Sequence, residues 1–469
     1  MLKRYARTFT VFSLLLATAA GGFAAQGNAQ QPQREQLLNG LPILLWSRPG
    51  EQKVLLKLRI NSGAAFDLAN KEGMTLLLAD ALFPDPTTRQ YVTEELGGRL
   101  DVRTTYDAID IALGGRVADF ERLVEVLRNA VVNMRLAEAE IAAQREGRVK
   151  GAKESAGQPA RVADGAAAAR LFGPHPYARL LDGTAESLSH VERADLMLAR
   201  DRFINPNNAT LVVIGGIERS RALRALRQYL GVWRKSDAQV PASFRRPETQ
   251  PAKTLLLDQP GSDRAEVRLA LKGVSRSDRD QAPASLLAVV AGNRWQTALE
   301  VPQSAASARH DAHSLSGLLL LSANVPSTAT AATISKAQGI LKDLAASPVS
   351  AAELERAKRS LLDGIAKRRA ADADVFLADQ WLDAATYGLP TNHDEAQVID
   401  AISTADLQRV AARLFTNQPV VSVVVGDAAQ LKPELSRLPD GFETPAPAGK
   451  PAAPAATPQT NATFPARRP

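Results

Sequence analysis

The sequence predicts an α+β protein built from two similar tandem domains. The first observation is length: 469 residues exceed what one hydrophobic core usually organises and suit two large domains. The second is an internal repeat. Residues 194–196 (Ala-Asp-Leu) recur as 405–407, and the strand-like residues 211–215 recur in register as 422–426, both at an offset of 211. A shared order and spacing of this kind indicates a duplicated unit.

Each half is expected to combine helices with a sheet of mainly antiparallel strands. Apolar residues alternate over residues 54–60 near the start of the first half, and over 267–271 near the start of the second. Alternation with a period of two is typical of a strand. Longer stretches with helical spacing follow, such as 120–134 and 353–367. Strands and helices in this order predict α+β domains with helices packed on a sheet.

Changes in composition divide the chain into five parts. A polar stretch containing proline separates the two halves and is interpreted as a linker. The last residues are rich in Pro and Ala and poor in large apolar side chains, so they are expected to be disordered. The expected parts are a signal peptide (1–29), an N-terminal domain (37–236), a linker (237–253), a C-terminal domain (254–438) and a tail (439–469).

The first 29 residues have the pattern of a secretory signal peptide. Three basic residues within the first seven precede an apolar run over residues 9–25, and small residues at Ala29 or Ala25 would suit cleavage. A retained membrane anchor is the alternative, although the apolar run is short for a membrane span. We therefore expect a periplasmic or secreted protein.

Charge and cysteine content exclude several classes of protein. The net charge is +7, and removal of the three basic residues of the signal would leave +4, with no dense Lys/Arg cluster. Nucleic-acid binding is therefore not expected. The chain has no cysteine, which excludes a disulfide scaffold, a thiolate metal site and a lipoprotein anchor. No second apolar run reaches membrane length, so stable membrane insertion is not expected.

Short motifs follow one another in order along residues 37–430. They are Leu-Asn-Gly-Leu-Pro-Ile at 38–43, Glu-Glu-Leu-Gly-Gly at 94–98, His-Pro-Tyr at 175–177 with Gly-Thr at 183–184, and Asn-Pro-Asn-Asn at 205–208. Together with the repeat, they resemble the insulinase/pitrilysin/mitochondrial processing peptidase family of zinc metallopeptidases. The resemblance implies half of a metallopeptidase clamshell, because family members enclose a chamber with four such domains, in one chain or in two.

The resemblance also implies that the zinc site is degenerate. The family helix reads Gly-Leu-Ala-His-Phe-Leu-Glu-His, and residues 73–80 here read Gly-Met-Thr-Leu-Leu-Leu-Ala-Asp. Leu76 and Asp80 then replace the two zinc-binding His, and Ala79 replaces the Glu that activates water. Leu76 has no lone pair and Ala79 cannot accept a proton. The third ligand, a Glu in the family, maps to Lys150. We expect no catalytic residue and no metal ligand in this chain.

The second half departs from the family pattern as well. Active members carry an Arg and a Tyr there that hold substrate and stabilise the oxyanion. Glu300 stands where the Arg is expected, and no Tyr precedes Gly317. The residues that would bind substrate are not assigned by the sequence.

The expected function is that of a noncatalytic subunit, a pseudoenzyme within a proteolytic complex. It would form a heterodimer with an active zinc peptidase homologue, which would hold the zinc, and complete a chamber for a peptide or unfolded polypeptide. One alternative is a stand-alone periplasmic peptide-binding or assembly factor that adds peptides to a sheet edge. Another is a zinc metalloendopeptidase with non-standard ligands, such as Asp80, Glu146 or the pair His310 and His313. For that pair, a solvated polar edge is the simpler expectation.

Overall fold

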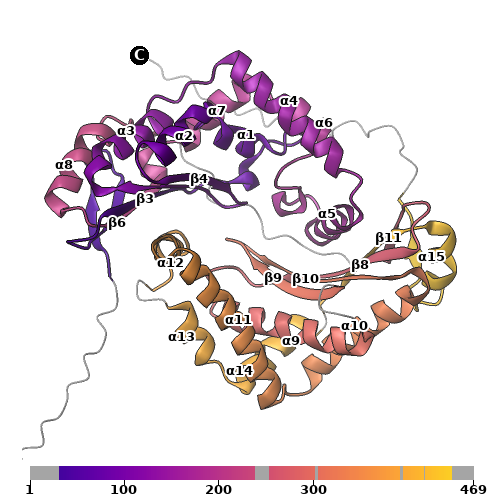
Figure 1. Cartoon of the computed structure of the whole chain (residues 1–469). Coiled ribbons are helices and arrows are strands. Elements are labelled where there is room, and N and C mark those ends of the chain that lie inside the picture. Colours follow the sequence, from indigo (N-terminus) through magenta and orange to yellow (C-terminus); the bar gives the residue numbers. More distant parts are fainter. Residues whose placement is uncertain (1–30, 238–252, 301–304, 391–393, 417, 446–469) are drawn as a thin grey trace, which may run out of the picture.

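The computed structural model describes residues 31–237, 253–300, 305–390, 394–416 and 418–445. Within these ranges the chain forms two α+β domains, each with its own sheet and helices (Figure 1), and the predicted fold class is confirmed. The expected signal peptide, nearly all of the linker and most of the tail lie outside the described residues.

The sheet of the first domain is mainly antiparallel. Its described strands are β1 (Gln33–Gln36), β2 (Pro42–Ser47), β3 (Lys53–Ile60), β4 (Arg99–Thr104), β5 (Ile109–Arg116) and β6 (Ala209–Gly215). They lie in the order β1-β2-β6-β3-β5-β4, and β2 and β6 run parallel. Because β6 comes from the end of the domain and enters the middle of the sheet, it ties the two ends of the domain together.

The sheet of the second domain repeats this layout. Its described strands are β7 (Thr254–Asp258), β8 (Arg264–Gly273), β9 (Ala306–Ala312), β10 (Gly317–Pro326), β11 (Val421–Gly426) and β12 (Phe442–Glu443). The order β12-β7-β11-β8-β10-β9 matches the first sheet strand for strand, with β12 in the outer place of β1. Strand β12 pairs with β7 and lies beyond residue 438, so the sheet extends past the expected domain boundary.

The helices of the first domain mostly form a layer on the outer face of its sheet (Figure 1). Their apolar residues recur at helical spacing, as in Phe120, Leu123, Val124 and Leu127, and join one buried core with the sheet. The described helices are α1 (Met74–Asp80), α2 (Pro86–Glu94), α3 (Phe120–Val131), α4 (Glu138–Ser155), α5 (Pro159–Phe172), α6 (Ala185–Ser189), α7 (Arg193–Phe203) and α8 (Arg219–Leu230).

The second domain has a corresponding helical layer. Trp295 at its centre is fully buried, and its indole N–H donates to the carbonyl of Thr333 at 3.2 Å. None of the described helices combines the length and the apolar character needed to cross a bilayer. The described helices are α9 (Gln281–Leu299), α10 (Thr330–Ala346), α11 (Ala351–Ala371), α12 (Ala373–Tyr387), α13 (Glu395–Asp400), α14 (Thr404–Phe415) and α15 (Ala428–Leu435).

Each domain also lends one helix to the inner face of the other sheet. Helix α5 packs on β8 and β11, and its Ala163, Ala167 and Leu171 join a core with those strands. Helix α12 packs on β3 and β6, where Trp381 and its neighbours form a second shared core. Figure 1 shows α12 beneath the first sheet and α5 above the second. The central strands β3, β6, β8 and β11 are therefore buried on both faces, and the two domains share one interface.

Candidate functional site

Helix α1 lies where the sequence places the zinc-binding helix of the family. The carboxylate of Asp67 anchors its N-terminus by accepting hydrogen bonds from the N–H groups of Gly73 and Thr75, both at 2.8 Å, and from the Thr75 hydroxyl. Burial raises the pKa of Asp67 to about 6, although these hydrogen bonds lower it. The helix is thus held in place by residues other than those of the expected metal site.

The three helix positions that would carry zinc chemistry hold unsuitable side chains. Leu76 is half-buried, and Ala79 is only 4% exposed and offers a methyl group. Asp80, at the last position of the helix, is the one residue of the three whose side chain has oxygen atoms. A zinc site needs about three donors and a proton acceptor nearby, so these residues do not fit the ion.

The carboxylate of Asp80 is already occupied by Arg148 of α4. The Arg148 guanidinium donates two hydrogen bonds to it, at 2.8 and 2.7 Å. The hydrogen bond with Asp80 raises the pKa of Arg148, so its charge is permanent. Lys150, which sequence counting places at the third ligand, is exposed on the same helix. The residue of α4 that contacts α1 at this point is therefore Arg148, and it puts a positive charge where a cation would bind.

Glu300, the predicted replacement of the substrate-binding Arg, ends helix α9. It is exposed and adopts a left-handed conformation with φ of 56°. The segment that follows, residues 301–304, lies outside the described residues.

His310 and His313 are packed against protein atoms, so the expectation of a solvated edge is wrong. The Nε2 atom of His310 accepts a hydrogen bond from the N–H of Val274, and Nδ1 contacts the hydroxyl of Ser285, both at 3.2 Å. The ring of His313 lies 5.0 Å from that of Tyr106 and 4.8 Å from that of Tyr177. Across the described residues, no three His, Asp or Glu side chains are grouped so that they could hold a metal ion.

The packing of His310 predicts a loss of stability in acid. Burial lowers its pKa to about 4, whereas an unfolded histidine titrates near 6.5. The stabilising contribution of the neutral ring is present above pH 6.5 and is lost as pH falls through 4, because the unfolded chain takes up the proton first. Between pH 7 and pH 4.5 the unfolding free energy of the parent should fall by about 2 kcal/mol more than that of the His310→Gln variant, as measured by denaturant unfolding.

The exposed His190, whose ring contacts the carbonyl of Asn70, provides the matched control for this experiment. The His190→Gln variant should keep the pH dependence of the parent. Equal pH dependence in the His310→Gln variant and the parent would show that His310 does not titrate in this range.

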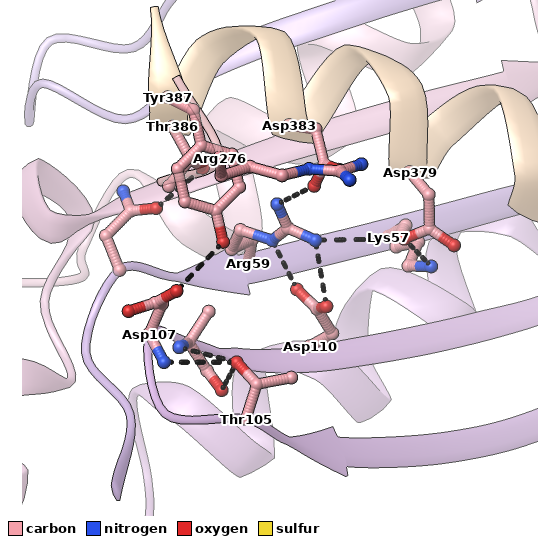
Figure 2. A network of polar contacts seen from close by, with 12 residues as sticks. Lys57, Arg59, Thr105, Asp107, Asp110, Arg276, Asp379, Asp383, Thr386 and Tyr387 are labelled. Carbon is pink, nitrogen blue, oxygen red and sulfur yellow. Dashed lines mark hydrogen bonds and ion pairs between the residues drawn. The ribbon is translucent and has the colours of Figure 1, made fainter. Parts of the chain in front are cut away.

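A buried ion network joins the two domains at the inner face of the first sheet (Figure 2). Arg59 of β3 is 6% exposed and donates to both oxygens of Asp110 on the neighbouring strand, at 2.7 and 3.0 Å. Its third hydrogen bond, at 2.7 Å, reaches Asp383 of α12 in the other domain. Lys57 of the same strand binds Asp379 one helical turn earlier. Charges of both domains are thus paired across the interface.

The charges in this network perturb one another. Burial alone would raise the pKa of Asp383, but Arg59 and Arg276 hold it below its ordinary value. Burial raises the pKa of Asp379, which Lys57 only partly offsets. Arg276 donates to Asp383 at 2.6 Å. One carboxylate of the second domain therefore receives a guanidinium from each domain.

A second polar contact between the domains centres on Asp107. Its carboxylate accepts hydrogen bonds from the hydroxyls of Tyr177 and Tyr387, at 3.0 and 3.3 Å, and from the N–H of Ser314 at 3.0 Å. Sequence reasoning missed both networks. The available signal was the pair Lys57 and Arg59, two charges at alternate positions of an otherwise apolar strand.

The fold and the site together define a class of protein: half of a metallopeptidase clamshell, with repeated α+β domains and a helix that lacks the zinc ligands. Comparison with known proteins finds similarity to one peptidase family. A model of the family described as "Peptidase M16 inactive domain" matches residues 190–361. The chain therefore contains a region similar to the inactive domain of peptidase M16, and the solved structures below share its fold. The resemblance predicted from the motifs is confirmed.

Two curated relatives are uncharacterized zinc proteases of mycobacteria. The protein of Mycobacterium tuberculosis is 23% identical over 208 residues, which are 43% of this chain and 48% of that protein. The protein of Mycobacterium leprae is 23% identical over 203 residues, 42% and 46% of the two chains. The match thus spans about half the length of these relatives.

Solved structures share the fold over most of the chain. A protease from Helicobacter pylori has a TM-score of 0.75 at 18% identity and covers 84% of this chain and 99% of its own. A peptidase M16 inactive domain from Pseudomonas fluorescens has a TM-score of 0.74 at 19% identity, with 85% and 98% covered. The first half of the periplasmic protease PqqL from Escherichia coli has a TM-score of 0.65 at 17% identity, with 86% and 94% covered.

Proposed function

We propose that this chain is a noncatalytic M16 subunit that pairs with an active, zinc-containing homologue and completes its peptide-binding chamber. The observation that carries the proposal is the Asp80–Arg148 ion pair, since it places a guanidinium on the only carboxylate of α1. A helix built in this way cannot supply the zinc chemistry of the family. In contrast, each of the two domains has a six-stranded sheet with helices packed on it.

Two features support a partner. The chain has the size and fold of half a clamshell, and one solved structure that it resembles is described as the first half of a periplasmic protease. Its curated relatives are described as zinc proteases, although each is matched over only about half its length.

We further propose export to the periplasm, directed by residues 1–29. Removal of those residues should leave the protein in the cytoplasmic fraction of a Gram-negative host.

The proposal also gives the shared interface a role. Helices α5 and α12 fill the inner faces of the two sheets, so a peptide has to bind at sheet edges or in clefts rather than on those faces. The ion network at Arg59 holds the two domains together as one unit. An enclosing chamber would then form between this unit and a second one.

The test measures zinc content and peptide hydrolysis by the purified chain alone, and by a mixture with the nearest homologue that retains the His-x-x-Glu-His motif. We expect no bound zinc and no hydrolysis for this chain alone. Size-exclusion chromatography of the coexpressed pair should show a 1:1 complex, and the complex should hydrolyse peptides faster than the homologue alone.

Other outcomes separate the rival functions. A chain that stays monomeric and leaves the homologue's activity unchanged, but binds peptides by itself, would favour the stand-alone binding or assembly factor. Stoichiometric zinc with chelator-sensitive cleavage by this chain alone would overturn the proposal, and would mean that the alignment with the zinc helix of the family does not identify the ligands.

A further inference from the structure

A pocket of about 330 Å³, lined by many charged side chains, opens between the two domains beside the ion network. Arg99 and Arg103 of the edge strand β4 form one wall. The opposite wall is formed by α12, whose Asp379, Gln380 and Asp383 line the pocket together with residues of α11 and α13. Figure 2 shows the region where Asp379 and Asp383 descend from α12 toward the strands.

The carboxylates that line this pocket all have basic partners. Asp379 binds Lys57, and Asp383 binds both Arg59 and Arg276. Two further ion pairs complete this set, Asp372 with Arg99 and Glu395 with Arg368. The acidic side chains of the pocket are therefore neutralised from within the protein, and they leave little attraction for a cation.

Two side-chain hydrogen-bond donors of the pocket have no partner among the described residues. The guanidinium of Arg103 forms no hydrogen bond or ion pair there, although the backbone of Arg103 pairs with β5. The side-chain Nε2 of Gln380 is buried, and it too lacks an acceptor among the described residues. A buried donor without an acceptor costs free energy, and such groups in native proteins often mark a place for a ligand or water. Gln380 is therefore the buried donor that lacks an acceptor, and the exposed Arg103 adds a positive charge that no carboxylate of the described residues pairs.

We propose that the pocket binds a carboxylate group of a peptide, with the guanidinium of Arg103 and the amide N–H₂ of Gln380 as its donors. A carboxylate supplies the charge that Arg103 lacks and an acceptor for Gln380, and such charge-assisted hydrogen bonds are stronger than neutral ones. The volume lies at the small end of ligand sites, which suits a terminal residue or one acidic side chain. This inference rests on the proposed function, because it names a feature of the peptides that the chamber would accept.

The experiment uses the purified chain without any partner and three fluorescent peptides of one sequence. The first has a free C-terminal carboxylate, the second a C-terminal amide, and the third the amide together with one internal glutamate. Fluorescence anisotropy gives the dissociation constants. We expect the first or the third peptide, or both, to bind at least about tenfold more tightly than the second, and the pattern identifies whether the terminal carboxylate or a side chain is recognised.

The variant Arg103→Gln should remove this tenfold preference, and Gln380→Leu should reduce it. Arg135→Gln is the matched control, because Arg135 is an exposed arginine that lines a different pocket on the outer layer of the first domain. It should keep the preference of the parent. Arg103 is itself exposed, and unchanged melting temperatures will confirm that the variants are folded.

Equal binding of all three peptides, no binding of any of them, or an equal preference in the parent and the Arg103→Gln variant would each overturn the inference. These results would leave the proposed function standing, since complex formation with the zinc-containing homologue is measured separately. Conversely, a carboxylate preference in a chain that forms no such complex would refute the subunit role alone.

Discussion

The Arg59→Met variant is expected to lose about 3–5 kcal/mol of unfolding free energy. The substitution removes the guanidinium that binds Asp110 and Asp383, and Asp110 is only 7% exposed. A buried carboxylate without its partner is far more costly than the net value of the ion pair. Chemical denaturation monitored by tryptophan fluorescence will measure the loss.

The matched control is Arg221→Met. Arg221 also forms a bidentate pair, at 2.9 and 2.6 Å with Glu121, but the pair lies within the first domain and is partly exposed to solvent. Pairs of that kind contribute up to about 1 kcal/mol. If both variants lose the same small amount, the network between the domains adds no more than an ordinary surface pair.

The repeated topology could be predicted because it depends on local patterns. The alternation in residues 54–60 and 267–271 corresponds to strands β3 and β8, which occupy equivalent places in the two sheets. Likewise the repeated segments at 211–215 and 422–426 fall on β6 and β11. Periodicity of this kind survives in a single sequence because alternate residues of each strand pack against the helices of its own domain.

The interface between the domains could not be predicted in this way. In the sequence, Lys57 and Arg59 have the pattern of side chains on the solvent-facing side of a strand. Their partners, Asp379 and Asp383, lie more than 300 residues later in the chain. Sequence patterns show that a helix has an apolar face without showing which sheet it covers. The exchange of α5 and α12 between the domains therefore appears only in three dimensions.

The position of the third zinc ligand shows the same limit on a smaller scale. Counting back from residues 158–159 gave Lys150, whereas Arg148 is the residue that reaches Asp80. Each residue along a helix rotates the side chain by about 100°, so residues two positions apart point to different faces. Counting residues cannot decide between these two faces, whereas zinc binding by variants at both positions does.

The largest gain of function is expected from the triple variant Leu76→His, Asp80→His and Arg148→Glu. Two histidines four residues apart on α1 would point to one side of the helix, and a glutamate on α4 would supply the third ligand. The same change removes the guanidinium that now lies against Asp80. We expect about one zinc ion per chain after dialysis, measured by elemental analysis, against none for the parent.

Two control variants test which residue of α4 matters. In the first, the two histidines are introduced and Arg148 is kept; a guanidinium about 4 Å from Zn²⁺ would oppose binding by roughly 8 kcal/mol at an effective dielectric constant of about 20. In the second, Lys150→Glu replaces Arg148→Glu. We expect neither to retain zinc, because in both a positive charge stays beside the new ligands. If zinc is retained only in the variant with Lys150→Glu, position 150 is the third ligand position, as counting along the sequence predicts. Zinc only after Arg148→Glu would show that the scaffold still supports a metal site, and that side chains rather than the fold removed it.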